Sequence, residues 1–333
     1  MHKFTHLQRP GVMFTPGAGD PYVTRLCDWI TEWDGQRPLD AAIVGAPLSK
    51  SSISFSGAHL HPATLRQLFS AFTTYNFEAD LDLSSLQVGD LGDVGMHVTD
   101  IPQCHRNIEQ AFQEISQQLP STIPCLVGGD HSITFPALTG IQSARQERIG
   151  LIQFDAHLDV RDTAYGGRSN GTPIRSLVEN SVIRGEDIVN IGLRSFANSK
   201  AYRDFAEQQG ITLYTARQVR EEGIKPILER TIRELAAKTD SVYVTFDIDV
   251  LDQADVPGVP AIGPGGLSPV DLFTCAELLG EWNRVIGMDM VCVDPSRDTR
   301  DRTSRISLHV LLYFLTGLAR RRLAFAEGGK LRK

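Results

Sequence analysis

The sequence I-G-L-I-Q-F-D-A-H-L-D, residues 149–159, decides the fold that we expect. Its first six residues form an apolar run, broken only by a glycine and Gln153, which is typical of a buried strand in a parallel sheet. If the extended backbone continues beyond this run, Asp155, His157 and Asp159 share one face, because alternate side chains of a strand do so. In open α/β sheets, ligands bind at the carboxyl ends of the strands. The stretch therefore predicts a binding site at the end of this strand.

Two other apolar runs end in residues of the same kind. Residues 123–127 lead into G-G-D-H-S, which contains His131, and residues 241–246 lead into Asp247 and Asp249. Taken singly, each piece is also explained by an aspartate that caps a helix, a core histidine or a turn. Because all three follow apolar strands, we expect four aspartates and two histidines to converge at one edge of a sheet.

Such a group of side chains suits divalent metal ions. Crowded carboxylates repel one another and raise one another's pKa, and a bound cation removes that cost. Carboxylate and imidazole ligands without a thiolate favour Mn²⁺, with Fe²⁺, Co²⁺, Ni²⁺ or Zn²⁺ as alternatives. Six ligands are more than one catalytic ion needs, so we expect two ions bridged by shared aspartates, about 3.5–4 Å apart as in other hydrolytic sites.

Composition limits the class of protein. The chain has 333 residues, 41% hydrophobic and 22% charged, as in a soluble globular protein, and its net charge of −7 argues against a nucleic-acid partner. No apolar segment is long enough to span a bilayer, and the N-terminus lacks the apolar core of a secretory signal. The five cysteines lack a C-x-x-C pair, so we expect reduced thiols and a cytoplasmic protein.

Strand and helix patterns alternate along the chain. We expect an N-terminal arm at residues 1–37, with a short helix around 23–33, and a single domain spanning 1–333. The alternation predicts an α/β fold with a mostly parallel sheet covered on both faces. The expected strands are 41–44, 86–88, 123–127, 149–154, 188–193, 212–214, 241–246 and 285–293, and the expected helices are 62–69, 108–119, 172–179, 201–209, 226–238, 269–282 and 304–321.

The motifs G-G-D-H-S (128–132), F-D-A-H-L-D (154–159) and T-F-D-I-D-V-L-D (245–252) resemble, in order and spacing, the signatures of the ureohydrolase superfamily. This superfamily contains arginases, agmatinases and formimidoylglutamases, and the resemblance covers about residues 40–320. It implies a three-layer α/β/α fold, a two-manganese centre and a homo-oligomer, usually a trimer or hexamer. One ion would be held by His131, Asp155, Asp159 and Asp247, and the other by Asp155, His157, Asp247 and Asp249.

A pair of metal ions predicts hydrolysis. Two cations stabilise hydroxide, and even one zinc ion brings the pKa of a bound water from 15.7 to about 7. Hydroxide attacks an amidine or guanidine carbon and gives a tetrahedral intermediate. Asp159 would act as the catalytic residue that holds the hydroxide proton and passes it to the leaving nitrogen.

The substrate's tail is indicated by residues around the predicted centre. The family often has a histidine where this chain has Asn170 and an acidic residue where it has Cys292, and both departures argue against plain arginase. Arg161 suits a carboxylate tail, since guanidinium matches carboxylate bidentately, and Arg175 and Arg168 are further candidates. The segments D-A-H-L-D-V-R and N-G-T-P-I-R are similar to formimidoylglutamases.

A structural role is the alternative for several of these residues. Arg161 could form a surface salt bridge with Asp162 or another acid, and Arg175 on its helix could form a surface salt bridge too. Asn170 could cap the helix that follows it. The histidines at 59 and 61 lie in a predicted loop, where solvated side chains are the simpler expectation.

We therefore predict the hydrolysis of N-formimidoyl-L-glutamate to glutamate and formamide, a step of histidine degradation, with two Mn²⁺ ions and a small-molecule substrate. An agmatinase, a guanidinobutyrase or another guanidine hydrolase that releases urea is the first alternative. A metal-binding relative without catalysis is the second.

Overall fold

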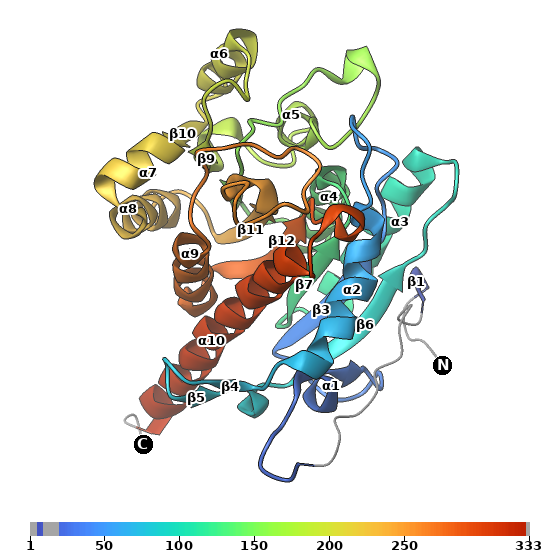
Figure 1. Ribbon diagram of the computed structural model, residues 1–333, viewed down its shortest axis with the longest axis vertical. Coiled ribbons are helices and arrows are strands. Elements are labelled where there is room, and N and C mark those ends of the chain that lie inside the picture. The colour runs from blue at the N-terminus through green and yellow to red at the C-terminus, as the bar shows by residue number, and fades with distance from the viewer. Residues whose placement is uncertain (1–4, 9–19, 331–333) are drawn as a thin grey trace.

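A mostly parallel sheet forms the centre of the computed structural model, which describes residues 5–8 and 20–330 (Figure 1). Its strands run in the order β1-β6-β3-β7-β12-β11-β8-β9-β10, with β2 also paired to β6, and only the β1–β6 pair is antiparallel. The strands of this sheet are β1 (Leu7–Gln8), β2 (Thr31–Glu32), β3 (Ala41–Ala46), β6 (Val88–Val94), β7 (Ile123–Gly128), β8 (Ile149–Phe154), β9 (Ile188–Leu193), β10 (Thr212–Thr215), β11 (Ser241–Asp247) and β12 (Val285–Val291).

Helices cover both faces of the sheet, as expected for a three-layer α/β/α fold. The helices are α1 (Leu26–Trp29), α2 (His61–Leu68), α3 (Ile101–Gln118), α4 (Thr134–Arg145), α5 (Pro173–Glu179), α6 (Lys200–Gln208), α7 (Ala216–Glu222), α8 (Ile224–Ala236), α9 (Pro269–Glu281) and α10 (Arg302–Lys330). A separate hairpin pairs β4 (Tyr75–Asn76) with β5 (Leu81–Asp82). None of the helices in the described part of the chain is both long and apolar enough to cross a bilayer.

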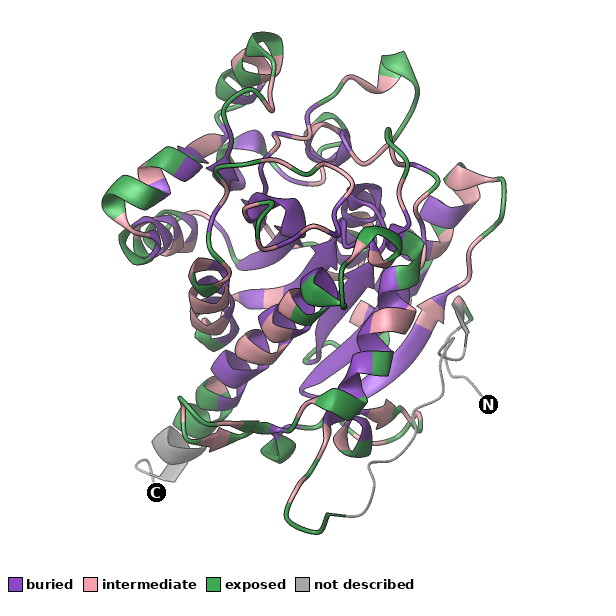
Figure 2. Cartoon of the chain, viewed as in Figure 1, coloured by how far each residue is buried: buried purple, intermediate pink, exposed green. Residues whose placement is uncertain are grey.

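Alternate residues of the central strands pack into two separate cores. Ile152 of β8 belongs to the core that contains Phe314 of α10, whereas its neighbour Leu151 belongs to the core that contains Phe112 of α3. Every residue of β7, β8, β9 and β11 is buried, which explains their continuous apolar sequences (Figure 2). Because these strands are parallel, the carboxyl ends of β7, β8 and β11 lie at the same edge of the sheet.

Helices α9 and α10 approach each other at two glycines. A Cβ atom at Gly280 would lie 2.1 Å from the Phe314 carbonyl oxygen, and one at Gly317 would lie 1.9 Å from the Glu277 carbonyl oxygen. Neither distance is tolerable, so only glycine allows the two backbones to pack so closely.

The predicted strands and helices are present, with three corrections. The strand expected at 86–88 is β6, which begins at Val88 and continues to Val94, and its Gly89 allows close contact with Leu39. Helix α3 begins at Ile101 rather than at 108, because Asp100 caps it through the Gln103 N–H. Helix α7 was not expected; its seven residues follow a Thr215 capping box.

The expected N-terminal arm lies partly outside the described residues, since residues 1–4 and 9–19 are not described. The described part contributes more than an arm. Leu7–Gln8 pair with β6, the helix expected around 23–33 is Leu26–Trp29, and Thr31–Glu32 join the sheet as β2.

Candidate metal centre

The loop after β8 places the first group of predicted ligands. The strand ends at Phe154, so the expectation that an extended backbone continues through residue 159 is wrong. Instead, the Asp155 carboxylate accepts a 2.6 Å hydrogen bond from the His157 backbone N–H, and Asp159 adopts a left-handed conformation with φ of 52°. Aspartate tolerates this conformation better than most residues. The three side chains are thus gathered by a turn rather than by strand alternation.

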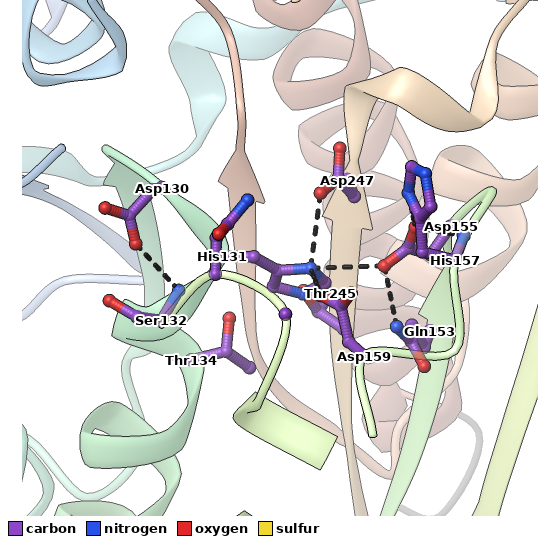
Figure 3. Close-up of polar contacts among 12 residues, drawn as sticks. Asp130, His131, Ser132, Thr134, Gln153, Asp155, His157, Asp159, Thr245 and Asp247 are labelled. Atoms are coloured by element: carbon purple, nitrogen blue, oxygen red, sulfur yellow. Dashed lines mark hydrogen bonds and ion pairs between the residues drawn. The ribbon is translucent and has the colours of Figure 1, made fainter. Parts of the chain in front are cut away.

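The six predicted ligands form two groups that share Asp155. His131 Nδ1 lies 3.2 Å from Asp155 Oδ2, 2.9 Å from Asp159 Oδ2 and 3.2 Å from Asp247 Oδ2 (Figure 3). The second group joins His157 Nδ1 to Asp155 Oδ1 at 3.3 Å and to Asp249 Oδ2 at 3.1 Å. Segments that are up to about a hundred residues apart in the sequence therefore meet at the carboxyl edge of β7, β8 and β11.

Burial and mutual repulsion perturb the protonation of this cluster. Burial and the Asp155 charge raise the pKa of Asp159 to about 6, and burial and Asp249 raise the pKa of Asp247 to about 8. Asp249 raises the pKa of His157 to about 12. Burial alone would lower the pKa of His131, but its three carboxylate neighbours raise it well above the usual value. Without a bound metal ion, some of these carboxylates must be protonated, because so many negative charges would otherwise repel one another.

Hydrogen bonds around His131 leave one ring nitrogen to face the cluster. Thr245 Oγ1 donates to Asp289 Oδ1 at 2.5 Å, because a carboxylate can only accept. The same hydroxyl lies 2.9 Å from His131 Nε2, so that nitrogen carries the proton and donates it. Nδ1 is buried without a hydrogen-bond partner and points at three carboxylates. A histidine that binds metal must be neutral, so Nδ1 would give up its proton and offer a lone pair beside three carboxylate oxygens, a donor set that fits a divalent cation.

A cavity of about 630 Å³ is lined by Arg161, two residues beyond the predicted ligand Asp159, and by none of the six ligands themselves. Its lining includes Ser51, His105, Arg161 and Arg168. Ser51 Oγ donates to Asp130 Oδ2 at 2.7 Å, which connects the cavity wall to the loop that carries His131.

Arg161 faces this cavity and has no carboxylate within ion-pair distance among the described residues. Its guanidinium lies 5.9 Å from the centre of the Tyr202 ring, and its backbone N–H donates to the Gly171 carbonyl. The alternative of a surface ion pair with Asp162 is wrong, since Asp162 pairs with Arg175 at 3.0 Å. Arg168 also lines the cavity, with its guanidinium 4.2 Å from the centre of the Phe135 ring.

Arg175 and Asn170 have structural contacts of their own. Arg175 pairs with both Asp162 and Glu179 and does not belong to the cavity lining, so its guanidinium is already satisfied. Asn170 Oδ1 accepts a 2.9 Å hydrogen bond from the Ile53 backbone N–H, and helix α5 has no side-chain cap. The capping alternative for Asn170 is therefore wrong, and this residue joins two loops of the cavity rim.

Of the two histidines expected in a loop and Cys292, only His59 is exposed. His59 is exposed, as expected, and lies 2.7 Å from Ser49 Oγ. The expectation is wrong for His61, which is fully buried between the Gly128 carbonyl and Ser307 Oγ, and burial lowers its pKa to about 4. Cys292 is buried, and burial raises its thiol pKa well above the usual value, so it is a neutral side chain.

Several residues that support the cluster were not predicted. They are polar side chains around the ligands, namely Thr245, Asp289, Gln153, Asn190 and Asn198. Asn198 holds the loop after β8 from both sides, since it accepts from the Leu158 N–H and donates to the Ala156 carbonyl. The sequence carried one usable signal, which is the presence of Gln153, Thr245 and Asp289 inside otherwise apolar strands.

Comparisons with known proteins agree with this geometry. A family model described as the arginase family matches residues 39–317. A formimidoylglutamase of Halalkalibacterium halodurans is 46% identical over 90% of this chain and 93% of that protein, and one of Bacillus subtilis is 39% identical over 96% and 98%.

Solved structures give the same result. The crystal structure of the Bacillus subtilis formimidoylglutamase has a TM-score of 0.88 over 94% of this chain and 96% of that one. A crystal structure of Trypanosoma cruzi formiminoglutamase with Mn²⁺ has a TM-score of 0.81 at 25% identity, over 90% and 99%. This chain belongs to the arginase family of hydrolases that act on amidine C–N bonds.

Proposed function

We propose that this protein hydrolyses N-formimidoyl-L-glutamate to L-glutamate and formamide with two Mn²⁺ ions. The observation that carries the proposal is the two-part ligand cluster, followed in the chain by a loop whose cavity is lined by two arginines, Arg161 and Arg168, without ion pairs among the described residues. The similarity to two formimidoylglutamases over nine-tenths or more of this chain supports it.

The ligand assignment that we propose follows the two groups of side chains. His131, Asp155, Asp159 and Asp247 would hold one ion, and Asp155, His157, Asp247 and Asp249 would hold the other. When bound, a pair of such ions lowers the pKa of a water so that it becomes a nucleophile near neutral pH.

Asp159 is the ligand placed to handle protons. Its side chain is 10% exposed, the largest fraction among the carboxylates of its group, so it is the acid of that group most open to a substrate; His157 of the second group is 26% exposed but is proposed as a ligand only. Its carboxylate would hold the proton of the attacking water and deliver it to the leaving nitrogen, which becomes the amine of glutamate.

The cavity arginines account for the rest of the substrate. N-formimidoyl-L-glutamate carries two carboxylates, and Arg161 and Arg168 each offer a guanidinium that no described carboxylate neutralises. Guanidinium binds carboxylate bidentately, which fixes orientation as well as charge. We leave Arg175 out of this site because of its two ion pairs, and we assign Asn170 to shaping the rim.

A substrate panel tests the proposal. The protein is loaded with Mn²⁺ and assayed with formimidoylglutamate, arginine, agmatine, guanidinobutyrate and guanidine. We expect formamide from the first and negligible urea from the others. Urea release would instead establish a guanidine hydrolase, a possibility raised by the guanidinobutyrase of Pseudomonas aeruginosa that is 31% identical to this chain. Manganese uptake without any turnover would establish a non-catalytic relative.

We also propose a homo-oligomer, a trimer or hexamer, of single-domain chains in the cytoplasm. The exposed Tyr75 and Phe77, whose ring centroids lie 6.2 Å apart at the β4–β5 hairpin, form a small apolar surface that a subunit contact could cover. The five free, buried cysteines suit a reducing compartment. Light scattering of the purified protein tests the mass, and a mass of one chain would contradict the oligomer.

A further inference from the structure

Two buried amides face each other across neighbouring strands beneath the metal cluster. Gln153 of β8 pairs in register with Asn190 of β9, and both residues are only 1% exposed. A polar side chain in the middle of a fully buried strand needs a partner, because burying an unpaired polar group is costly.

Hydrogen-bond chemistry fixes the orientation of both amides. The Asp155 carboxylate can only accept, so the Gln153 atom 2.7 Å from Asp155 Oδ2 is the donor Nε2. Gln153 Oε1 then accepts from Asn190 Nδ2 at 2.8 Å, and the same Nδ2 donates to the His157 carbonyl at 2.8 Å. Asn190 Oδ1 is left buried without a hydrogen-bond partner.

These hydrogen bonds determine the orientation of the Asp155 carboxylate. Its Oδ2 accepts from Gln153 and lies 3.2 Å from His131 Nδ1, whereas its Oδ1 accepts from the His157 backbone N–H and lies 3.3 Å from His157 Nδ1. One donor on each oxygen therefore fixes the carboxylate plane, with one oxygen directed to each ligand group.

We propose that Asn190 and Gln153 form a positioning relay that holds Asp155 as the bridge between the two ions. Asn190 acts at two points, since it orients the Gln153 amide and also holds the His157 carbonyl in the loop after β8. The inference rests on the proposed function, because a bridge requires a two-ion centre. Outer contacts of this kind orient metal ligands and tune their affinity.

The relay is tested with Gln153→Met, Asn190→Leu and the double variant, and with Thr231→Val as a control. Thr231 on α8 is also fully buried with an unpaired hydroxyl, so its replacement alters a buried polar group elsewhere. The stepwise affinity for Mn²⁺ is measured by competition with a chelator, and electron paramagnetic resonance reports the coupling between the two ions.

We expect Gln153→Met and Asn190→Leu each to weaken Mn²⁺ binding by about 10- to 100-fold and to change the coupled spectrum. Because Asn190 acts through Gln153, the double variant should resemble Asn190→Leu rather than multiply the two effects. Thr231→Val should match the wild type. Asn190→Ala, which removes the amide without adding volume to the core, replaces Asn190→Leu if the leucine variant does not fold.

The relay would be overturned if the folded variants kept the wild-type Mn²⁺ affinity and spectrum. In that case the wild type would still bind two ions and release formamide, so the proposed function would stand. Independent, multiplying effects would overturn the coupling between Asn190 and Gln153. A wild-type protein that bound no Mn²⁺ would instead overturn the proposed function on which the relay rests.

Discussion

Asp159 combines an unusual backbone with a proposed chemical role. Its φ of 52° lies in the left-handed region, where asparagine is tolerated as well as aspartate. Asp159→Asn should therefore keep the turn while removing the carboxylate that accepts a proton. We expect kcat to fall by about 10²- to 10⁴-fold, the usual contribution of a positioned acid or base.

Asp159 is also a proposed ligand, so the variant's manganese content must be measured by atomic spectrometry beside its kcat. A variant that retains both ions but loses turnover supports the proton role. Turnover above about a tenth of the wild-type rate would contradict it, since that is a smaller loss than acid–base catalysis normally gives.

In the proposed function, Arg161 determines which substrate tail the site prefers. Arg161→Ala removes a charged hydrogen-bond donor worth about 1.5–3 kcal/mol, so kcat/KM for formimidoylglutamate should fall by about 10- to 100-fold. Activity on agmatine, whose tail is an amine, should change little. Arg184→Ala is the matched control, since Arg184 is exposed and its weak pairing with Glu186 lies outside the cavity lining. Equal losses in the two variants would refute a specific role for Arg161.

At the scale of elements, the sequence allowed the strands that carry the ligands to be predicted. The fully buried β7, β8 and β11 each have continuous apolar runs that end in His, Asp or Gly, so their ends could be assigned to one sheet edge. The turn after β8 could not be predicted from periodicity, because it depends on Asn198, which is distant in the sequence and contacts the loop only in the folded chain.

The same reason applies to the supporting polar residues. Gln153 interrupts an apolar run and could have been noticed as a signal, but its partner Asn190 is 37 residues away on another strand. For Arg175, the i,i+4 pairing with Glu179 on α5 could have been read from the sequence, whereas its second partner, Asp162, lies 13 residues away in the loop after β8. Side-chain partners that meet only through tertiary contacts cannot be predicted from local sequence patterns.

The close approach of α9 and α10 gives a stability prediction. Gly317→Ala places a Cβ against the Glu277 carbonyl, and overpacking of this kind costs about 1–3 kcal/mol, more than the gain in helix propensity of about 1 kcal/mol. The melting temperature should fall, and Gly280→Ala should do the same from the other helix. Leu323→Ala, at a half-exposed position on α10, should have a smaller effect. A Gly317→Ala protein as stable as the wild type would show that the helices can move apart freely.

For the whole molecule, protonation and metal binding compete at the same atoms. In the metal-free fold, burial with Asp155 raises the pKa of Asp159 from 3.8 to about 6, and burial with Asp249 raises that of Asp247 from 3.8 to about 8. Below about pH 6.5 these two extra protons are offset by His61 and His105, whose pKa values burial lowers from 6.5 to about 4. Above that pH, Asp247 and His157 (pKa about 12) keep protons that the unfolded chain has lost, so the stability should decline as the pH rises from about 6.5 to about 8.

Manganese should reverse this trend, because a bound cation replaces the protons that the carboxylates otherwise need. We expect the increase in melting temperature on adding saturating Mn²⁺ to be larger at pH 8 than at pH 6, measured by calorimetry. Asp159→Asn, which removes one of the titrating groups, should show a smaller difference between the two pH values. Equal increments at both pH values in the wild type would contradict the linkage.

Two hydrogen bonds, from the Ile53 N–H to Asn170 Oδ1 and from the Asn170 N–H to the Ser51 carbonyl, tie together the two polypeptide stretches that border the cavity. Neither stretch can be re-engineered alone, since a replacement at one side displaces the other. To change the substrate preference of this protein to that of a relative, both stretches must therefore be exchanged together. The proposed metal ligands at the sheet edge need no change.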